Sequence, residues 1–472
     1  MTQNSEGISK ESMTQQATQE ERYLSAFKAF EHNGASTDPA WLRELRRQAI
    51  ADFDRLGFPT ARRGNEPWKY TDIRPIANAQ LTPLPSETAG RPTVNAARYE
   101  LPCPRVHQLV FVDGHYAPGL STEPRSEAGM RSEIIAHKGD GPIVGRLADA
   151  IEYGLPLAKE YLARHAPSSS SAFAALNTAF LSDGAFVYIP DGVHVPEPIY
   201  ILFIATEASA RHAAHPRVLI VAGKDSSARI LQSYETAGAD SAYFNNAVTE
   251  VVTQSGASLN LYKLQREGAE AFHVATTQAV VGRDSRLSST TVDMGGKLVR
   301  HDINVLLAES GGSVALHGLY LGRGESHTDN HTFIDHAVPN TSSDEVYKGI
   351  LDDRSHAVFL GHVLVRQDAQ QTSSHQVNKN LLLSAAAEVN TQPKLEIFAD
   401  DVTCTHGAAV GQLDESALFY LKSRGIGEDV ARGLLVHGFV NEVIEGIADE
   451  AVRQYIDEAI KAQLRQQPAV AI

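Results

Sequence analysis

The feature that most constrains the fold is a long central stretch of short β-prone runs. From Gly184 to about Gly411, runs of apolar and β-branched residues recur, separated by Gly, Asp, Ser and Asn. No amphipathic segment of helix length interrupts these runs. An alternating strand–helix sheet is therefore excluded, and a sandwich, a barrel or a solenoid remains. The expected strands include residues 186–189, 199–204, 218–221, 248–252, 305–307 and 357–360.

A repeated local phrase distinguishes among these three architectures. A turn, then a serine, then an apolar residue three positions later, occurs at Ser227, Ser258, Ser285, Ser313 and Ser355. The successive spacings are 31, 27, 28 and 42 residues, and the copy at Ser285 is the weakest. A sandwich gives no reason for this spacing, whereas the stacked coils of a β-helix bury each apolar face on the next coil. We interpret the His- and Gly-rich residues 322–344, inside the longest gap, as an insertion.

The regions on either side of this core show helical periodicity. We expect a disordered N-terminus over residues 1–20, a mainly helical N-terminal domain over 21–183, a β-helix core over 184–413 and a C-terminal helical domain over 414–472. A short strand is predicted at residues 108–112, before an Asp-Gly turn. The N-terminal helices are predicted at residues 20–32, 39–56, 143–164 and 172–181.

Composition excludes several classes of protein. The formal net charge of −15 argues against nucleic-acid binding and against docking on an anionic membrane surface. No apolar run approaches the roughly 20 residues that a membrane-spanning helix needs. Residues 1–21 lack the apolar segment of a secretory signal, and 2 cysteines in 472 residues exclude a disulfide framework. A cytoplasmic protein with reduced thiols is therefore expected.

Common catalytic motifs are absent from the sequence. It contains no GxxxxGK[ST] phosphate loop, HExxH, CxxC pair or GxSxG elbow, so we expect no nucleotide site of its own. One enzymatic alternative is a β-helix enzyme that acts on a polysaccharide or another extended polymer, with carboxylates along a groove. The missing signal segment and the helical C-terminal domain argue against this alternative.

The most suggestive short segment is DDVTCTHG, residues 400–407. If it is extended, Cys404 and His406 lie two residues apart and point to the same face. A thiolate beside an imidazole suits zinc, iron or an iron–sulfur fragment. The alternative is a cysteine packed as a small hydrophobic side chain beside a hydrogen-bonded histidine, and the residues alone favour this alternative.

A second group of chemically interesting residues contains His327, His331 and His336. In one strand His327 and His331 share a face while His336 does not, so we favour a polar rung of the solenoid over a metal-binding loop. Residues 62–73, with Trp68 and Tyr70, are interpreted as an aromatic anchor between the helical domain and its neighbour rather than as a ligand site.

Three segments resemble the SufB/SufD family, the scaffold proteins of the SUF iron–sulfur cluster assembly system. They are NEPWKYTDI at 65–73, HTFIDHAVPNTSSDEVYKGIL at 331–351 and KLEIFADDVTCTHGAAVGQLDESALFYLKSRGI at 394–426. The similarity runs from about residue 60 to the C-terminus. The EPWKYTD and CxHGA sequences are similar to the SufD branch. Cys404 is the only cysteine after Cys103, whereas a SufB chain is expected to carry an additional one.

The resemblance implies a right-handed parallel β-helix with helical domains at both ends. It implies a non-enzymatic scaffold subunit that pairs with SufB through the β-helix core and binds the ATPase SufC, where ATP is hydrolysed, through its C-terminal helices. Cys404 and His406 match the family's CxH pair at the SufB interface, where they are candidate ligands for a transient Fe–S cluster or for iron shared with SufB. Docking of SufC is expected around Tyr420, Arg424 and Gly425. A homodimer of the isolated chain, flavin binding, the cluster type and the route of iron entry are left open by the residues.

Overall fold

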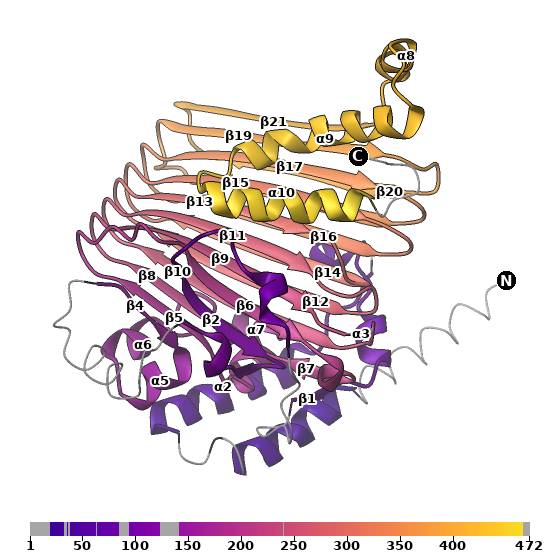
Figure 1. The fold of residues 1–472 in the computed structure, drawn as a ribbon. Coiled ribbons are helices and arrows are strands. Elements are labelled where there is room, and N and C mark those ends of the chain that lie inside the picture. Colours follow the sequence, from indigo (N-terminus) through magenta and orange to yellow (C-terminus); the bar gives the residue numbers. More distant parts are fainter. Residues whose placement is uncertain are drawn as a thin grey trace.

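Two parallel β sheets wind around a common interior and form a solenoid of about 8 turns (Figure 1). The structure is a computed structural model, and it describes residues 19–32, 35, 38–62, 64–84, 94–122, 141–238 and 240–465. The chain alternates between the two sheets along almost the whole core. The prediction of a mainly β fold built on a parallel β-helix is confirmed.

The two sheets, named sheet A and sheet B, contain all the described strands. Sheet A consists of β1 (Thr82–Pro83), β4 (Ile143–Arg146), β5 (Gly184–Ile189), β7 (His212–Ala214), β8 (Arg217–Ala222), β10 (Phe244–Thr253), β12 (Phe272–Val281), β14 (Leu298–Leu307), β16 (His327–His336), β18 (His356–Val365) and β20 (Glu388–Ile397). Sheet B consists of β2 (His107–Val112), β3 (His115–Tyr116), β6 (Ile199–Ala205), β9 (Ser227–Thr236), β11 (Ser258–Arg266), β13 (Arg286–Asp293), β15 (Ser313–Gly322), β17 (Ser342–Leu351), β19 (Thr372–Leu382) and β21 (Val402–Gly411). Both sheets therefore include strands that precede residue 184.

The predicted insertion at residues 322–344 is wrong, because this stretch is a regular part of a coil. It contains β16 and the first residues of β17, and Ser342 pairs in register with Ser313, 29 residues earlier. Ser342 is thus the copy that follows Ser313, while Ser355 precedes β18 in the other sheet. Strands of both sheets start after a turn that ends in serine. The repeated sequence pattern therefore occurs at two different corners of the solenoid.

One corner of the solenoid uses a left-handed backbone residue in each of seven coils. The amide of each such residue donates to a carbonyl oxygen of the neighbouring coil, as from Asp225 to Ser255 at 2.9 Å. Gly, Asp and Asn tolerate positive φ best, which explains why these residues separate the β-prone runs. The residues are Gly192 (φ 71°), Asp225 (53°), Gly256 (72°), Asp284 (54°), Gly311 (80°), Asn340 (59°) and Gln371 (58°).

Helices pack on the N-terminal end of the solenoid (Figure 1). Residues 19–32 are helical, and the other helices are α2 (Ala40–Leu56), α3 (Arg74–Asn78), α5 (Leu147–Glu152), α6 (Pro156–Tyr161) and α7 (Ala172–Ala179). Short 3₁₀ turns are η1 (Glu66–Trp68), η2 (Ala96–Tyr99), η3 (Pro118–Leu120), η4 (Ser168–Ser170) and η5 (Glu207–Ser209). No helix in the described ranges is both long enough and apolar enough to cross a bilayer.

Two predictions for this region are wrong. The single helix at 143–164 is replaced by β4 and two short helices, because Val144 packs into the solenoid interior and Gly154 (φ 69°) interrupts the remainder. Disorder through residue 20 fails at its last two positions. Gln19 Nε2 donates to the Leu81 carbonyl (3.1 Å), and Glu20 Oε1 accepts from the Phe58 amide (2.8 Å). Residues 1–18 lie outside the described ranges.

A buried ion pair joins the N-terminal helices to the solenoid. Arg217 on β8 donates to Glu250 on β10 at 2.6 Å, and both side chains are 0% exposed. The Glu250 carboxylate also accepts backbone amides of Ala163, His165 and Ala166 at 2.8 to 3.1 Å. Arg217 in turn donates to Asn177 on α7 (3.0 Å). The Arg217–Glu250 pair therefore forms hydrogen bonds both within the solenoid and with the N-terminal region that packs on it.

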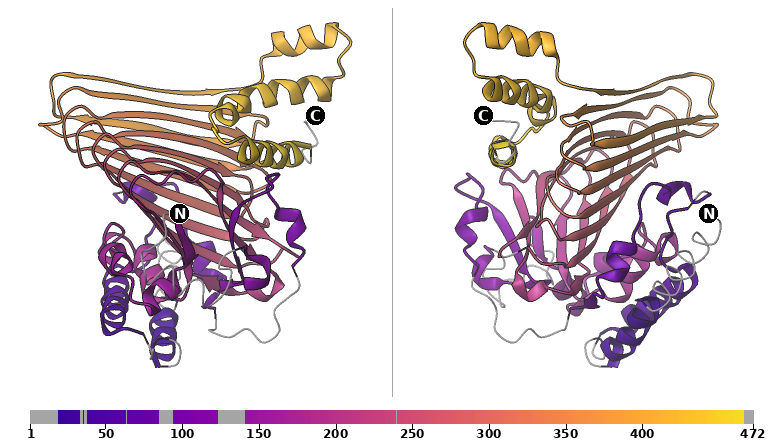
Figure 2. Two further views of the ribbon diagram at one scale, coloured as in Figure 1. Left: turned by 60° about the vertical axis from the view of Figure 1, so that its left-hand side comes forward. Right: turned by 90° about the vertical axis from the view of Figure 1, so that its right-hand side faces the viewer.

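The C-terminal helices are α8 (Glu415–Ser423), α9 (Glu428–Glu445) and α10 (Glu450–Arg465). The Asp414 carboxylate caps α8 by accepting the amides of Ser416 and Ala417, as its position in the sequence predicts. Helices α9 and α10 lie along the outer face of sheet B, whereas α8 projects away from the body of the protein (Figures 1 and 2).

We predict that Glu250→Ala lowers the free energy of unfolding by roughly 3–5 kcal/mol, because it leaves Arg217 as a buried, unpaired charge. Urea unfolding followed by circular dichroism measures the change. The control is Glu309→Ala, which removes the exposed partner of Arg283 and should leave the unfolding midpoint in place. Equal midpoints for the two variants would contradict a central role for the buried pair.

Candidate functional site

Cys404 and His406 lie on β21, the last strand of sheet B. The segment is extended, so the two side chains point to the same face, as the sequence analysis assumed. Their register partners on β19 are Ser374 and Gln376, respectively. Cys404 packs against the apolar interior of the solenoid, so this face is the inner one. The pair therefore stands where the interior reaches the C-terminal end of the solenoid.

The two side chains differ in their surroundings. Cys404 is partly buried, and burial raises the pKa of its thiol, an effect that the backbone amide of Ser374 opposes. His406 is exposed. Both residues are thus accessible at the end of the solenoid, with the thiol in its neutral form at ordinary pH.

The last coil also presents strand edges and apolar side chains. Among the described strands, β20 pairs with β18 alone and β21 pairs with β19 alone. Ile397, Phe398 and Val410 beside these edges are 39%, 63% and 49% exposed. Unpaired edges with apolar neighbours favour association with another β surface.

In the two coils below this pair, two short rows of polar side chains lead to it, and the sequence analysis missed them. Ser343 Oγ donates to Ser374 Oγ at 2.8 Å, one coil below Cys404. Gln376 Nε2 donates to Glu345 Oε2 at 2.5 Å, one coil below His406. Only the coil register reveals these rows, because their members are about 30 residues apart in the sequence.

The three histidines of β16 do not come together. His336 points inward and bonds to Thr341 Oγ1 (2.8 Å) and Ser343 Oγ (2.9 Å). His327 and His331 point outward, and His327 Nδ1 lies 3.0 Å from His356 Nδ1. In the described part of the chain, no group of three or more His, Cys, Asp or Glu residues is arranged to hold a metal ion. The histidines belong to a regular polar rung, as favoured from the sequence.

Residues 64–73 form an anchor on the outer face of sheet A. The Trp68 ring lies 3.8 Å from the Arg300 guanidinium, which also donates to the Pro67 carbonyl at 2.8 Å. Thr71 donates to Asp329, which in turn forms an ion pair with Arg300 at 2.5 Å. The aromatic-anchor interpretation therefore agrees with these contacts.

Helix α8 and the turn that follows it carry the residues expected to dock SufC. Tyr420 is 57% exposed and its ring lies 5.1 Å from the Arg424 guanidinium. Gly425 (φ 85°) follows the end of α8 in a backbone conformation that favours glycine. Phe419, Val430 and Leu434 are 74%, 45% and 47% exposed. With Tyr420 they are the exposed large apolar side chains of the α8–α9 hairpin.

A cluster of charged side chains inside the solenoid also escaped the sequence analysis. Glu267 lies 2.7 Å from His273, Asp293 lies 3.0 Å from His301, and Lys263 Nζ lies 3.2 Å from His301 Nδ1. Burial lowers the pKa of Lys263 to about 7 and that of His273 to about 4. Burial thus disfavours the charged forms of these two bases.

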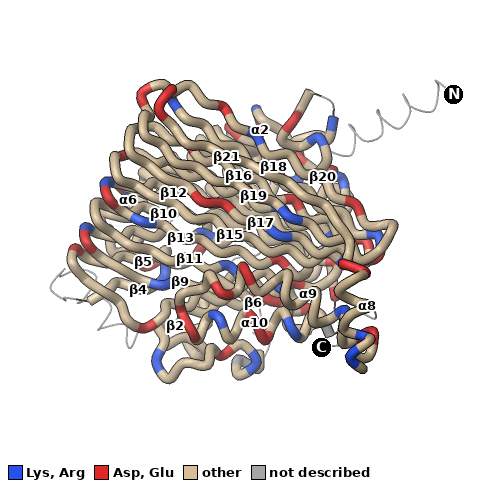
Figure 3. Tube along the Cα trace, turned by 90° about the horizontal axis from the view of Figure 1, so that it is seen from above, with Lys and Arg blue, Asp and Glu red and all other residues tan. Residues whose placement is uncertain are grey.

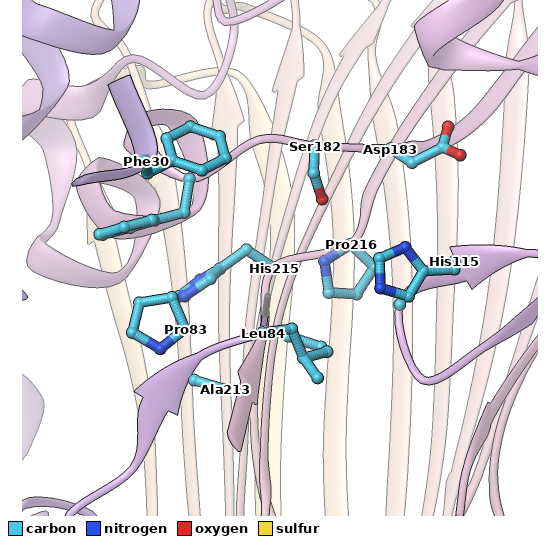
Figure 4. A pocket seen from close by; sticks show the side chains of 12 residues that line it. Phe30, Pro83, Leu84, His115, Ser182, Asp183, Ala213, His215 and Pro216 are labelled. Carbon is cyan, nitrogen blue, oxygen red and sulfur yellow. The ribbon is translucent and has the colours of Figure 1, made fainter. Parts of the chain in front are cut away.

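The pocket in Figure 4 lies at the opposite end of the solenoid from Cys404 and His406. Its volume of about 30 Å³ suits one or two water molecules. His215 stacks on Phe180 there, and burial lowers the pKa of this imidazole to about 3. This small cavity does not contribute to the candidate site.

Comparison with known proteins covers almost the whole chain. The profile of the SufBD protein N-terminal region matches residues 17–201, and that of the SUF system FeS cluster assembly SufBD core domain matches residues 203–439. An iron–sulfur cluster assembly SufBD family protein of Synechocystis is 31% identical, over 85% of this chain and 87% of the relative. The iron–sulfur cluster assembly protein SufD of Escherichia coli is 28% identical, over 89% and 91%. The chloroplastic protein ABCI7 of Arabidopsis thaliana is 29% identical, over 83% and 80%.

We predict that Glu345→Gln becomes more stabilising as pH rises. Burial raises the pKa of Glu345 from 4.5 to about 7. The folded chain therefore binds this proton more tightly than the unfolded chain does. The stability that protonated Glu345 contributes is complete below pH 4.5 and is lost as pH rises toward 7. Glutamine stays neutral, so the variant should gain up to about 3 kcal/mol over the parent above pH 7.

Denaturant unfolding of both proteins at pH 5 and pH 8 measures this difference. The exposed Glu388 at the start of β20 provides the control, because Glu388→Gln should show no such pH dependence. A stability difference between Glu345→Gln and the parent that stays constant with pH would contradict the prediction.

Proposed function

The chain belongs to the SufBD family of the SUF iron–sulfur cluster assembly system, and from this membership we propose that it is a SufD-type scaffold subunit. In this proposal the chain is not itself an enzyme. It works in the cytoplasm with SufB and with the ATPase SufC, which hydrolyses ATP.

The observation that carries the proposal is the position of Cys404 and His406 beside unpaired strand edges. A second solenoid that docks on the edges of β20 and β21 meets this pair directly. Two ligands do not complete the coordination of a cluster, which typically takes four protein ligands. We therefore assign the remaining ligands to SufB, with the transient cluster or its iron held between the two chains.

The α8–α9 hairpin is the proposed docking surface for SufC. Helix α8 stands away from the solenoid (Figure 2). Its residues Phe419 and Tyr420 are largely exposed, so a partner can surround them. Aromatic residues of this kind commonly dominate binding energy at interfaces.

Helix α9 connects this hairpin to the coils near the pair. Lys348 on β17 donates to the Phe439 carbonyl on α9 at 2.8 Å, and the same ammonium pairs with Glu442. Strand β17 pairs with β19, which pairs with β21. We propose that movements of SufC during ATP hydrolysis reach the last coil by this route.

Charge on the protein agrees with protein partners rather than nucleic acid. Figure 3 shows acidic and basic residues interspersed, mostly at the turns of the coils and on the helices. The alternative, a β-helix enzyme that acts on a polysaccharide or another extended polymer, needs carboxylates along a groove, and family membership favours the scaffold over it. When SufB is absent, two copies of this chain would pair through the edges of β20 and β21. Co-expressed SufB would take the place of the second copy.

We predict that His406→Ala lowers the iron and acid-labile sulfide of the complex on the order of tenfold while this chain still co-purifies with SufB and SufC. The complex is co-expressed, isolated through a tag on this chain, and reconstituted without oxygen. His375→Ala, on β19, is the control because His375 pairs with Asp344 on the outer face. Loss of the complex itself would leave His406 a structural role only.

We predict that Phe419→Asp weakens binding of SufC by at least about tenfold, since it replaces the most exposed apolar side chain of the hairpin with a charge. Titration calorimetry with purified SufC gives the dissociation constant. Gln454→Asp on the exposed face of α10 adds the same charge elsewhere and should bind normally. Equal affinities for the two variants would remove the hairpin from the SufC interface.

A further inference from the structure

The interior row that ends at His406 changes character two coils before it. The row runs through in-register partners in sheet B, from Ile230 on β9 to His406 on β21. Its earlier members are mostly apolar, with one serine, and its last three are Glu345, Gln376 and His406. From Ile230 onward the row is Ile230, Leu261, Ser289, Leu316, Glu345, Gln376 and His406.

Glu345 and Gln376 are the most deeply buried polar residues of this row. Both are 0% exposed. Gln376 Nε2 donates to Glu345 Oε2 at 2.5 Å, while Gln376 Oε1 is buried with no hydrogen-bond partner. A buried acceptor without a donor lowers stability, so an apolar residue would serve stability better at this position.

The unpartnered oxygen has a donor of the right kind in the neighbouring strand. Gln376 and His406 are register partners, and neighbouring strands lie about 4.8 Å apart. Because Gln376 Nε2 donates to Glu345, the Gln376 amide nitrogen faces β17. The amide oxygen then faces β21, which carries His406. A neutral imidazole carries one N–H donor and one nitrogen free to act as a ligand.

We propose that Gln376 is a positioning residue for His406, with Glu345 as the anchor that fixes the orientation of the Gln376 amide. This inference rests on the proposed function for the ligand role of His406. Gln376 Oε1 accepts the imidazole N–H of His406, and the other ring nitrogen then faces the end of the solenoid as the ligand. Partners of this kind fix both the ring orientation and the tautomer of ligating histidines.

Three variants separate positioning from a structural role. Gln376→Met keeps the length of the side chain and removes the acceptor, and Glu345→Met removes the anchor. Glu345→Gln retains an oxygen that accepts the Gln376 amide, so it should rescue the behaviour of the parent. Asn378→Ala on the same strand is the control, because Asn378 lies in the neighbouring row, in register with Ala408.

The first measurement uses the isolated full chain with ¹⁵N-labelled histidine at pH 8. In the parent and in Glu345→Gln, we expect one predominant tautomer of His406. Both methionine variants should shift it to a mixture, while Asn378→Ala loses stability without changing the tautomer. An unchanged tautomer in Gln376→Met, with the fold intact by circular dichroism, overturns the proposal.

The second measurement is the iron and sulfide content of the complex with SufB and SufC. Gln376→Met should reduce it about tenfold, as outer partners of metal ligands commonly do. If Gln376→Met keeps the iron and sulfide content of the parent while His406→Ala lowers it, the positioning role is overturned and the scaffold function stands. If His406→Ala keeps the iron and sulfide content of the parent, His406 is not a ligand. The tautomer measurement alone then decides whether Gln376 accepts the imidazole N–H of His406.

Discussion

The constraint on which the rest of the structure depends is the in-register stacking of parallel coils. Each strand pairs residue by residue with strands about 30 positions away, so every interior side chain belongs to a row along the solenoid. An apolar row builds the core, and a polar row must satisfy itself from coil to coil. The same rule that packs Leu261 and Leu316 therefore also places Gln376 under His406.

Stacking has a second consequence at the end of the solenoid. A coil can bury its inner face and pair its backbone only if another coil follows, and among the described strands none follows β20 and β21. The result is a surface with unpaired backbone groups, exposed Phe398 and Val410, and two candidate ligands. The proposed chemistry and the proposed partner docking therefore share one location, because both would use the groups that the last coil leaves unpaired.

The helices at both ends attach to the solenoid through buried charges rather than through apolar contacts alone. Arg217 with Glu250 serves the N-terminal helices, and Arg300 with Asp329 and Trp68 holds the 64–73 segment. Lys348 serves α9 in the same way. Each cation lies on a strand of the solenoid and donates hydrogen bonds to oxygen atoms of a segment far away in the sequence. Such contacts fix the position of the attached segment more specifically than an apolar surface can, because their geometry is directional.

The sequence by itself determined the solenoid, the strand that carries Cys404 and His406, and the Asp414 cap of α8, because each follows from local pattern or spacing. It failed at residues 143–146, where packing of Val144 against β5 overrode helical periodicity, and at 322–344, where one phrase marked two corners. Only the tertiary structure decided that Glu345 and Gln376 lie beneath His406 and that His336 points away from His327. The physical reason is that these neighbours are set by the register between coils, which no local stretch of the chain contains.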